Sequence, residues 1–200
     1  MRLRAAPRAF FTFDSECCAL CQHTAHEAHG AGSRAMMCQR APCMNRLPEA
    51  LVVKGYRHWL SGHISGDLDA WAQAWTLYAG TLGAAQGRVT LNGLAQFVNA
   101  LGRCAVCPLR FLPTGSEHLC RDECLVVSLV AALQHGDDEA GQFSAEALTC
   151  RARCQDAIAA ASEFAMSLKI SGYSLLPVPQ AAIADVLASE AAQVRAATIH

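Results

Sequence analysis

Apolar residues recur at three- and four-residue steps through most of the chain after residue 46. This spacing places them on one face of an α-helix, and no segment shows the strict alternation that is typical of a half-buried strand. Glycine and proline interrupt the pattern at intervals, as they do between helices. The sequence therefore predicts an all-α fold, a bundle of about five to six helices.

Helix boundaries are predicted from this spacing together with capping residues. The predicted helices cover residues 47–60 with Asn45 as N-cap, 67–82, 91–101 with Thr90 as N-cap, 117–135 with Ser116 as N-cap, 144–171, and a last amphipathic helix after residue 179. The fourth helix is apolar on nearly all sides from Leu125 to Leu133, which predicts a central position in the fold. Gly136 and Gly141 are expected to flank the turn before the fifth helix.

Composition divides the chain into three parts. Residues 1–46 are rich in Cys, His and Met and lack apolar periodicity, so we expect an irregular N-terminal segment. Residues 47–172 carry the helical pattern and form the predicted bundle core. Residues 173–200 hold an extended linker at 176–179, where two prolines occur, and the last amphipathic helix.

Charge and hydropathy narrow the possible partners. The formal net charge is −1 and no face rich in Lys and Arg is expected, which argues against a nucleic-acid partner bound through phosphate contacts. The longest apolar run, residues 125–133, is about half of the roughly 20 residues that a membrane span needs. We therefore expect no nucleic acid and no membrane among the partners.

The eleven cysteines are interpreted through the compartment in which they occur. The apolar stretch 9–13 is too short for the hydrophobic region of a signal peptide and is followed at once by Asp14 and Glu16. A cytoplasmic location is therefore expected, where thiols stay reduced and serve as metal ligands or redox centres. An odd total cannot pair off within one chain, although a partial disulfide framework is the alternative.

Two close cysteine pairs flank one predicted loop. Cys104 and Cys107 precede it, and Cys120 and Cys124 follow after twelve intervening residues. If the third and fourth helices form a hairpin, all four thiols meet, and they suit a tetrahedral Zn²⁺ with Zn–S bonds of about 2.3 Å or an iron–sulfur cluster. His118 is an alternative ligand, and the acidic residues 122 and 123 would add negative charge beside the metal or stabilise the helix start.

Cys150 and Cys154 form another pair, four residues apart on the predicted fifth helix. With Cys120 and Cys124 on the fourth helix, they would lie level if the two helices pack antiparallel. Inward-facing pairs of this kind resemble those of bacterial copper-storage bundles, which implies Cu⁺ as an alternative cargo. Taken alone, Cys150 and Cys154 fit core packing as small apolar side chains better than they fit ligation.

The N-terminal segment contains further soft ligands. Sulfur and imidazole together suit Cu⁺, Zn²⁺ or iron, so the segment is interpreted either as a second site or delivery arm or as a flexible tail that is cysteine-rich by composition. The candidate ligands here are Cys17, Cys21, Cys38 and Cys43.

No catalytic constellation is recognised, because phosphate loops, nucleophile elbows and metalloprotease motifs are all missing from the sequence. The preferred prediction is a cytoplasmic metal-binding or iron–sulfur protein, an accessory, assembly or sensing factor with a possible protein partner. A thiol redox protein that uses Cys104 and Cys107 is a further alternative, although no βαβ context surrounds that motif.

Overall fold

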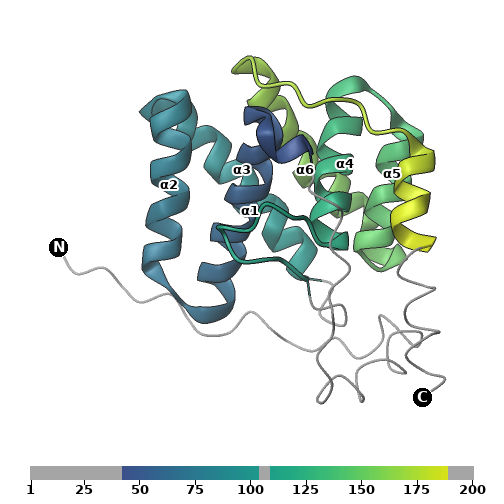
Figure 1. Cartoon of the computed structure of the whole chain (residues 1–200), viewed down its shortest axis with the longest axis horizontal. Coiled ribbons are helices and arrows are strands. Elements are labelled where there is room, and N and C mark those ends of the chain that lie inside the picture. The colour runs from purple at the N-terminus through teal and green to yellow at the C-terminus, as the bar shows by residue number, and fades with distance from the viewer. Residues whose placement is uncertain (1–41, 104–108, 189–200) are drawn as a thin grey trace.

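The computed structural model describes residues 42–103 and 109–188, and these residues contain helices, turns and loops but no β-strand (Figure 1). The all-α prediction is confirmed. The elements are η1 (Pro42–Asn45), α1 (Leu47–Ser65), α2 (Leu68–Leu82), α3 (Ala84–Gly102), α4 (Arg121–His135), α5 (Asp138–Leu148), η2 (Arg151–Arg153) and α6 (Cys154–Ile170), followed by a helical stretch over residues 180–188. None of the described helices is both long enough and apolar enough to cross a bilayer.

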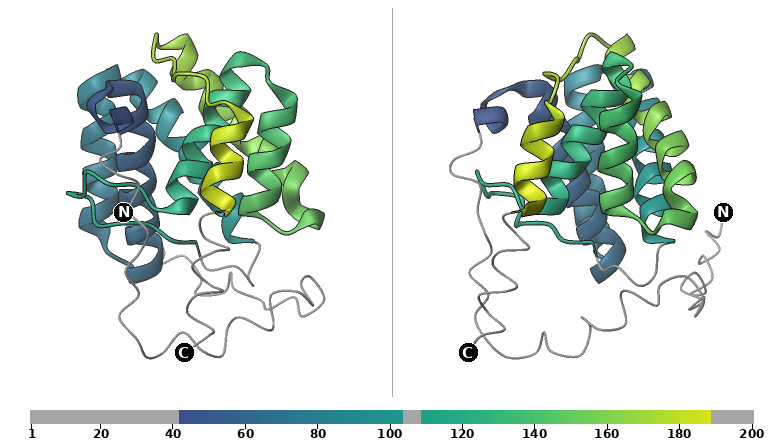
Figure 2. Two further views of the ribbon diagram at one scale, coloured as in Figure 1. Left: turned by 45° about the vertical axis from the view of Figure 1, so that its right-hand side comes forward. Right: turned by 90° about the vertical axis from the view of Figure 1, so that its right-hand side faces the viewer.

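The helices form two groups of three that pack against each other. α1, α2 and α3 contact one another, as do α4, α5 and α6. The groups join where α1 packs on α4 and where α3 packs on α6. Consecutive helices run in alternating directions, and α2 and α5 lie on opposite outer sides (Figures 1 and 2). The shared core therefore lies among α1, α3, α4 and α6.

Close packing at the α3–α6 contact depends on a small residue and on aromatic rings. A Cβ atom added at Gly93 would lie 3.1 Å from the Phe164 Cα, so glycine permits the close approach of the two helices. Phe164 stacks on Phe97 at a centroid distance of 6.4 Å and meets the edge of Tyr78 at 6.4 Å. These rings are fully buried and join both groups of helices.

α4 is buried along residues 125–132, as the apolar run predicts. The first two helices also begin close to their predicted starts. α1 begins at Leu47 with Arg46 in place of Asn45 at the N-cap position. Asp67 caps α2, since its Oδ1 accepts from the Asp69 amide at 2.9 Å.

Two predicted helix starts were wrong. α3 begins at Ala84 directly after Gly83, whose φ of 81° makes the turn, so Thr90 lies buried inside the helix and does not cap it. α4 begins at Arg121 with Cys120 as N-cap, four residues later than predicted. Residues 116–119 stay outside the helix because the carbonyl groups of Ser116 and His118 accept hydrogen bonds from the side chain of Arg57.

The single fifth helix predicted over 144–171 was also wrong, because the chain forms two helices there. α5 already starts at Asp138, where Asp137 accepts from the Ala140 amide at 3.0 Å, so Gly141 lies within it. Extended backbone at Thr149 then ends it. One helix over 144–171 would be about 42 Å long, whereas the 19 residues of α3 span about 28 Å. The break lets both pieces pack within the length of the bundle.

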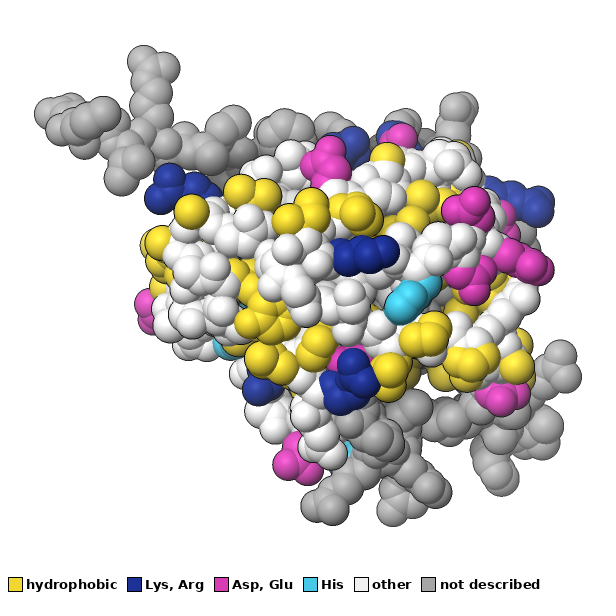
Figure 3. Space-filling model, turned by 90° about the horizontal axis from the view of Figure 1, so that it is seen from above, with side chains coloured by type: hydrophobic (Ala, Val, Ile, Leu, Met, Phe, Trp, Pro, Cys, Tyr) yellow, Lys and Arg dark blue, Asp and Glu magenta, His cyan; other side chains and the backbone are white. Residues whose placement is uncertain are grey.

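The segment after α6 crosses the top of the bundle and is extended until residue 179, as predicted. The Leu175 amide donates to Oε1 of the buried Gln134 at 2.8 Å, and the Leu176 amide donates to Glu49 Oε1 at 2.9 Å. The segment therefore connects α6 with α4 and α1. The face of the molecule at this end carries hydrophobic and charged side chains intermixed, without a field of one sign (Figure 3).

Candidate functional site

The four cysteines whose side chains the structure describes lie toward one end of the bundle. Because the helices alternate in direction, α3 and α5 end where α4 and α6 begin (Figure 1). Cys120 and Cys124 lie at the first turn of α4, Cys150 follows α5, and Cys154 begins α6. We call this the thiol end. Two segments far apart in the sequence thus bring sulfur atoms to one side of the fold.

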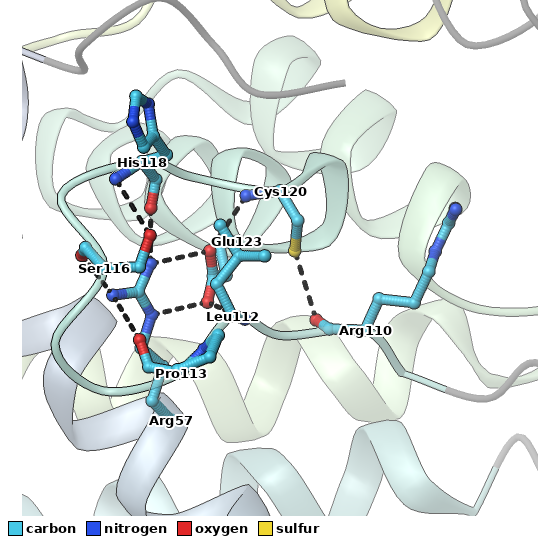
Figure 4. A network of polar contacts seen from close by, with 8 residues as sticks. All are labelled: Arg57, Arg110, Leu112, Pro113, Ser116, His118, Cys120 and Glu123. Atoms are coloured by element: carbon cyan, nitrogen blue, oxygen red, sulfur yellow. Dashed lines mark hydrogen bonds and ion pairs between the residues drawn. The ribbon is translucent and has the colours of Figure 1, made fainter. Parts of the chain in front are cut away.

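A buried ion pair fixes the geometry of the thiol end. Arg57 on α1 donates from Nε to Glu123 Oε1 at 2.6 Å and from Nη2 to Glu123 Oε2 at 3.0 Å (Figure 4). Both side chains are fully excluded from solvent. A paired, bidentate geometry is what makes two buried charges tolerable. The pair therefore joins α1 firmly to the beginning of α4.

The same arginine organises the loop between α3 and α4. Its Nη1 group donates to the carbonyls of Pro113 and Ser116 at 3.3 and 2.6 Å, and Nη2 donates to the carbonyl of His118 at 2.5 Å. Glu123 in turn accepts from the Leu112 amide at 2.9 Å. The loop is therefore folded back onto the ion pair. The imidazole ring of His118 points away from it (Figure 4).

Cys120 lies where this loop returns to α4. Its amide donates to Glu123 Oε2 at 2.9 Å, and its thiol donates to the carbonyl oxygen of Arg110 at 3.4 Å. The Arg110 amide donates to Asp122 Oδ2 at 2.8 Å. The loop residues that follow Cys107 and Pro108 therefore run beside the first turn of α4, with Arg110 at the Cys120 sulfur.

The surroundings of Cys120 keep its thiol protonated. Burial raises the pKa of Cys120 to about 12, and the carboxylates of Glu123 and Asp122 add to the shift, although the backbone amides of the same two residues oppose it. A neutral thiol is a weak nucleophile. The same carboxylates favour a cation that replaces the proton.

A second polar group is buried nearby. Tyr56, next to Arg57 on α1, is fully buried, and its hydroxyl has no hydrogen-bond partner among the described residues. Burial raises the pKa of Tyr56 well above its usual value, and the negative groups of Asp122, Cys120 and Glu123 raise it further. The phenol is therefore neutral at physiological pH.

The expected hairpin of the third and fourth helices needs correction. α3 packs mainly on α2 and α6, whereas α4 packs on α5, α6 and α1, so the two helices do not pair along their length. The ion pair of Arg57 with Glu123, and not a helical hairpin, determines the path of the loop toward Cys120. Cys104 and Cys107 lie outside the described residues, so the four-thiol site stays a prediction.

The predicted cysteine pairs on helix faces also need correction. Cys150 and Cys154 do not share one helix, because η2 separates them. Both are buried, and the Cys154 sulfur accepts from Gln142 Nε2 at 3.5 Å. α4 and α6 run parallel and not antiparallel (Figure 1). The helix-face arrangement on which the copper-store resemblance depended is therefore missing from the described residues.

The remaining predicted ligands are not positioned. Cys17, Cys21 and Cys38 lie outside the described residues, and Cys43 lies in η1 with its side chain undescribed. Within 42–103 and 109–188, no group of three or more His, Cys, Asp or Glu side chains is placed to hold a metal ion. A four-ligand site at the thiol end therefore requires the pair Cys104 and Cys107.

Arg57 is the functional residue that the sequence pattern did not reveal. It occupies an apolar position of α1 between Tyr56 and Leu60, and a charged residue at such a position signals a buried partner. That partner is 66 residues away, and helical periodicity contains no information about contacts at that separation.

The fold and the site together define a class, an all-α bundle whose described thiols gather at one end. No protein-family model, no curated protein and no solved structure matches the chain.

Proposed function

We propose that this protein binds a soft metal ion or an iron–sulfur cluster at the thiol end, with Cys104, Cys107, Cys120 and Cys124 as ligands, and that it acts in the cytoplasm without catalysing a reaction. The observation that carries the proposal is the 3.4 Å contact between the Cys120 sulfur and the Arg110 carbonyl.

Covalent geometry explains why this contact matters. Arg110 follows Cys107 by three residues, and three residues of extended chain span at most about 11 Å. The length of the chain between them therefore allows Cys107 to approach Cys120, and the proposal requires that it does. Cys124 lies on the next turn of the same helix start, and Cys104 directly follows Arg103 at the end of α3. We propose that the two pairs meet there around one ion.

The charges around Cys120 favour a cation over a redox reaction. A thiol whose pKa is about 12 is almost entirely protonated at neutral pH, so it is a poor nucleophile for disulfide exchange. A thiophilic cation displaces the proton, and the nearby carboxylates of Asp122 and Glu123 then stabilise the positive ion. These groups support a binding site and give no support to thiol catalysis by Cys120.

The test is elemental analysis of the full-length chain together with its absorption spectrum after anaerobic purification. We expect either one Zn²⁺ per chain in a colourless protein or iron with acid-labile sulfide and visible absorption. Several Cu⁺ ions per chain would instead favour copper handling. A wild-type protein that takes up none of these would disprove the proposal.

Serine variants locate the site. Cys107→Ser and Cys120→Ser should each lose most of the metal. The matched control is Cys154→Ser, because Cys154 lies on α6, and serine there keeps an acceptor for Gln142. That variant should retain the full metal content. Unchanged metal in Cys107→Ser and Cys120→Ser would place the ligands elsewhere in the chain.

The biological role follows from the identity of the ion. The proposed role is that of an accessory, assembly or sensing factor with a protein partner. Transfer of the ion to or from a purified partner protein would agree with this role.

A further inference from the structure

A cavity of about 190 Å³ lies where α4, α5 and α6 meet. Its lining consists of Leu133 from α4, Asp138, Gly141 and Gln142 from α5, and Gln155 and Ile158 from α6. Asp138 and Gln155 are exposed, so the cavity is open to solvent. A cavity of about 150 Å³ holds one benzene molecule, so this one has room for a ligand of about six to eight non-hydrogen atoms.

Helical spacing brings the lining side chains together. Asp138 and Gln142 lie one turn apart on α5, and Gln155 and Ile158 lie one turn apart on α6. Gln155 Nε2 donates to Gln142 Oε1 at 3.0 Å, and this hydrogen bond holds the two helices' lining residues against each other. The partly buried side chains of Leu133 and Ile158 supply apolar atoms. The cavity therefore has an apolar wall beside a polar one.

The polar wall offers acceptors to a ligand. Gln142 Nε2 is already engaged, because it donates to Glu146 Oε1 at 2.7 Å and to the Cys154 sulfur at 3.5 Å. The amide nitrogen of Gln155 is engaged with Gln142. Within residues 42–103 and 109–188, in contrast, no group donates to the Asp138 carboxylate or to Gln155 Oε1. A ligand therefore meets oxygen acceptors, and one of these groups carries a negative charge.

We propose that this cavity binds a small organic cation, an alkylammonium ion with a chain of about five carbons. Its ammonium group donates to Asp138 and Gln155, and its chain lies on Leu133 and Ile158. An ammonium group has three donors and no acceptor, which complements a wall of acceptors, and burial of the chain removes apolar surface from water. The site uses none of the four cysteines proposed as metal ligands.

The size and exposure of the cavity determine the expected affinity. A ligand of so few atoms makes few contacts, and the carboxylate of Asp138 is exposed to water and salt. We therefore expect a dissociation constant of about 1 to 10 mM.

The test is an NMR titration of the full-length chain with n-pentylammonium chloride. The methyl resonances of Leu133 and Ile158 should shift along one saturating curve. Those of Ile64 and Ile170 should stay in place, because these side chains are 65% and 77% exposed and do not line the cavity. The neutral analogue n-pentanol should bind at least about fivefold more weakly, since it lacks the charge that pairs with Asp138.

Two variants test the role of the carboxylate. Asp138→Asn should weaken binding of n-pentylammonium about fivefold. The matched control is Glu139→Gln, which removes the same charge from the same turn of α5 at a residue that does not line the cavity. That variant should bind n-pentylammonium as the wild type does. Both side chains are exposed, so both variants should remain folded.

Several outcomes would overturn the proposal. Resonances of Leu133 and Ile158 that do not move, or that move only together with those of Ile64 and Ile170, would show that the cavity does not bind the cation. Equal binding of n-pentanol would remove the need for a charge, and this comparison uses the wild type alone. Equal affinities of Asp138→Asn and Glu139→Gln would exclude the contact with Asp138.

Discussion

Arg57 and Glu123 lie 66 residues apart and form a bidentate ion pair from which solvent is excluded. Arg57 belongs to the first group of three helices and Glu123 to the second. The same two side chains bind the loop that leads to Cys120 at Leu112 and at Ser116. One pair of charges therefore joins the two halves of the fold and positions the candidate site.

Replacing Glu123 with Gln should destabilise the protein by about 3 kcal/mol. Breaking a buried ion pair leaves an uncompensated charge on Arg57. In addition, the NH₂ group of the new glutamine side chain would meet the backbone N–H groups that now donate to Glu123. The measurement is chemical denaturation of the variant and of the wild type.

An exposed ion pair provides the control for that change. Asp156→Asn removes the partner of Arg153, a pair at 3.7 Å in which both side chains are at least one-third exposed. The free energy of unfolding should fall by less than about 1 kcal/mol. A Glu123→Gln variant as stable as Asp156→Asn would show that the buried pair does not hold the halves together.

Gly55→Ala should destabilise the bundle by about 1 to 3 kcal/mol. Gly55 packs directly against the ring and hydroxyl of Tyr78, so an added methyl group would overlap that buried side chain. Gly80→Ala on the exposed side of α2 is the matched control. Nothing lies within 4 Å of a Cβ atom there, and the change should stabilise the helix by about 0.5 to 1 kcal/mol. Thermal unfolding of both variants tests the contrast, and equal effects would contradict it.

Gln134→Ala should release the extended segment that follows α6. The Gln134 side chain donates to the carbonyls of Ala165 and Tyr173, both at 3.1 Å, and accepts from the Leu175 amide. Removing this side chain should lower the free energy of unfolding by about 2 kcal/mol and accelerate hydrogen exchange at the Leu175 amide. Gln155→Ala, an exposed control, should change stability by less than about 0.5 kcal/mol. Unchanged exchange at Leu175 in the Gln134 variant would exclude this role.

Cys120 in the folded, metal-free protein should react slowly with iodoacetamide at neutral pH. Its pKa is raised from 9.0 to about 12, so the thiolate fraction is small and keeps increasing as the pH passes 9. In urea the same cysteine should react at least about tenfold faster at neutral pH. As the pH is raised, its rate should level off once the pH exceeds the ordinary pKa of cysteine. Peptide mapping by mass spectrometry identifies the labelled site. Equal rates for folded and unfolded chains at neutral pH would contradict the shift.

The raised pKa of Cys120 also makes the stability of the fold depend on pH. Because the pKa is higher in the folded state, the contribution is fully present below pH 9.0 and disappears as the pH rises toward about 12. Alkaline conditions should therefore weaken the fold more in the wild type than in Cys120→Ala, which lacks the titrating group.

Local rules predicted the helices because periodicity and caps act over a few residues. α2 begins directly after Asp67, within one residue of its predicted start, and the apolar run of α4 became its buried face. The rules failed where a distant contact outweighed a local preference. Ser116 did not cap α4, because the carbonyls of the neighbouring loop accept from Arg57. Periodicity likewise did not reveal the break at Thr149, where the backbone becomes extended.

The sequence by itself determined that the chain is helical, which run of residues is most buried, and that its thiols occur in pairs. Only the tertiary structure decided which helices are neighbours, that α3 and α4 do not pair along their length, and that Arg57 positions the loop beside Cys120. The physical reason is range. Helix formation depends on contacts within about one turn, whereas a buried ion pair depends on two side chains that only the complete fold brings together.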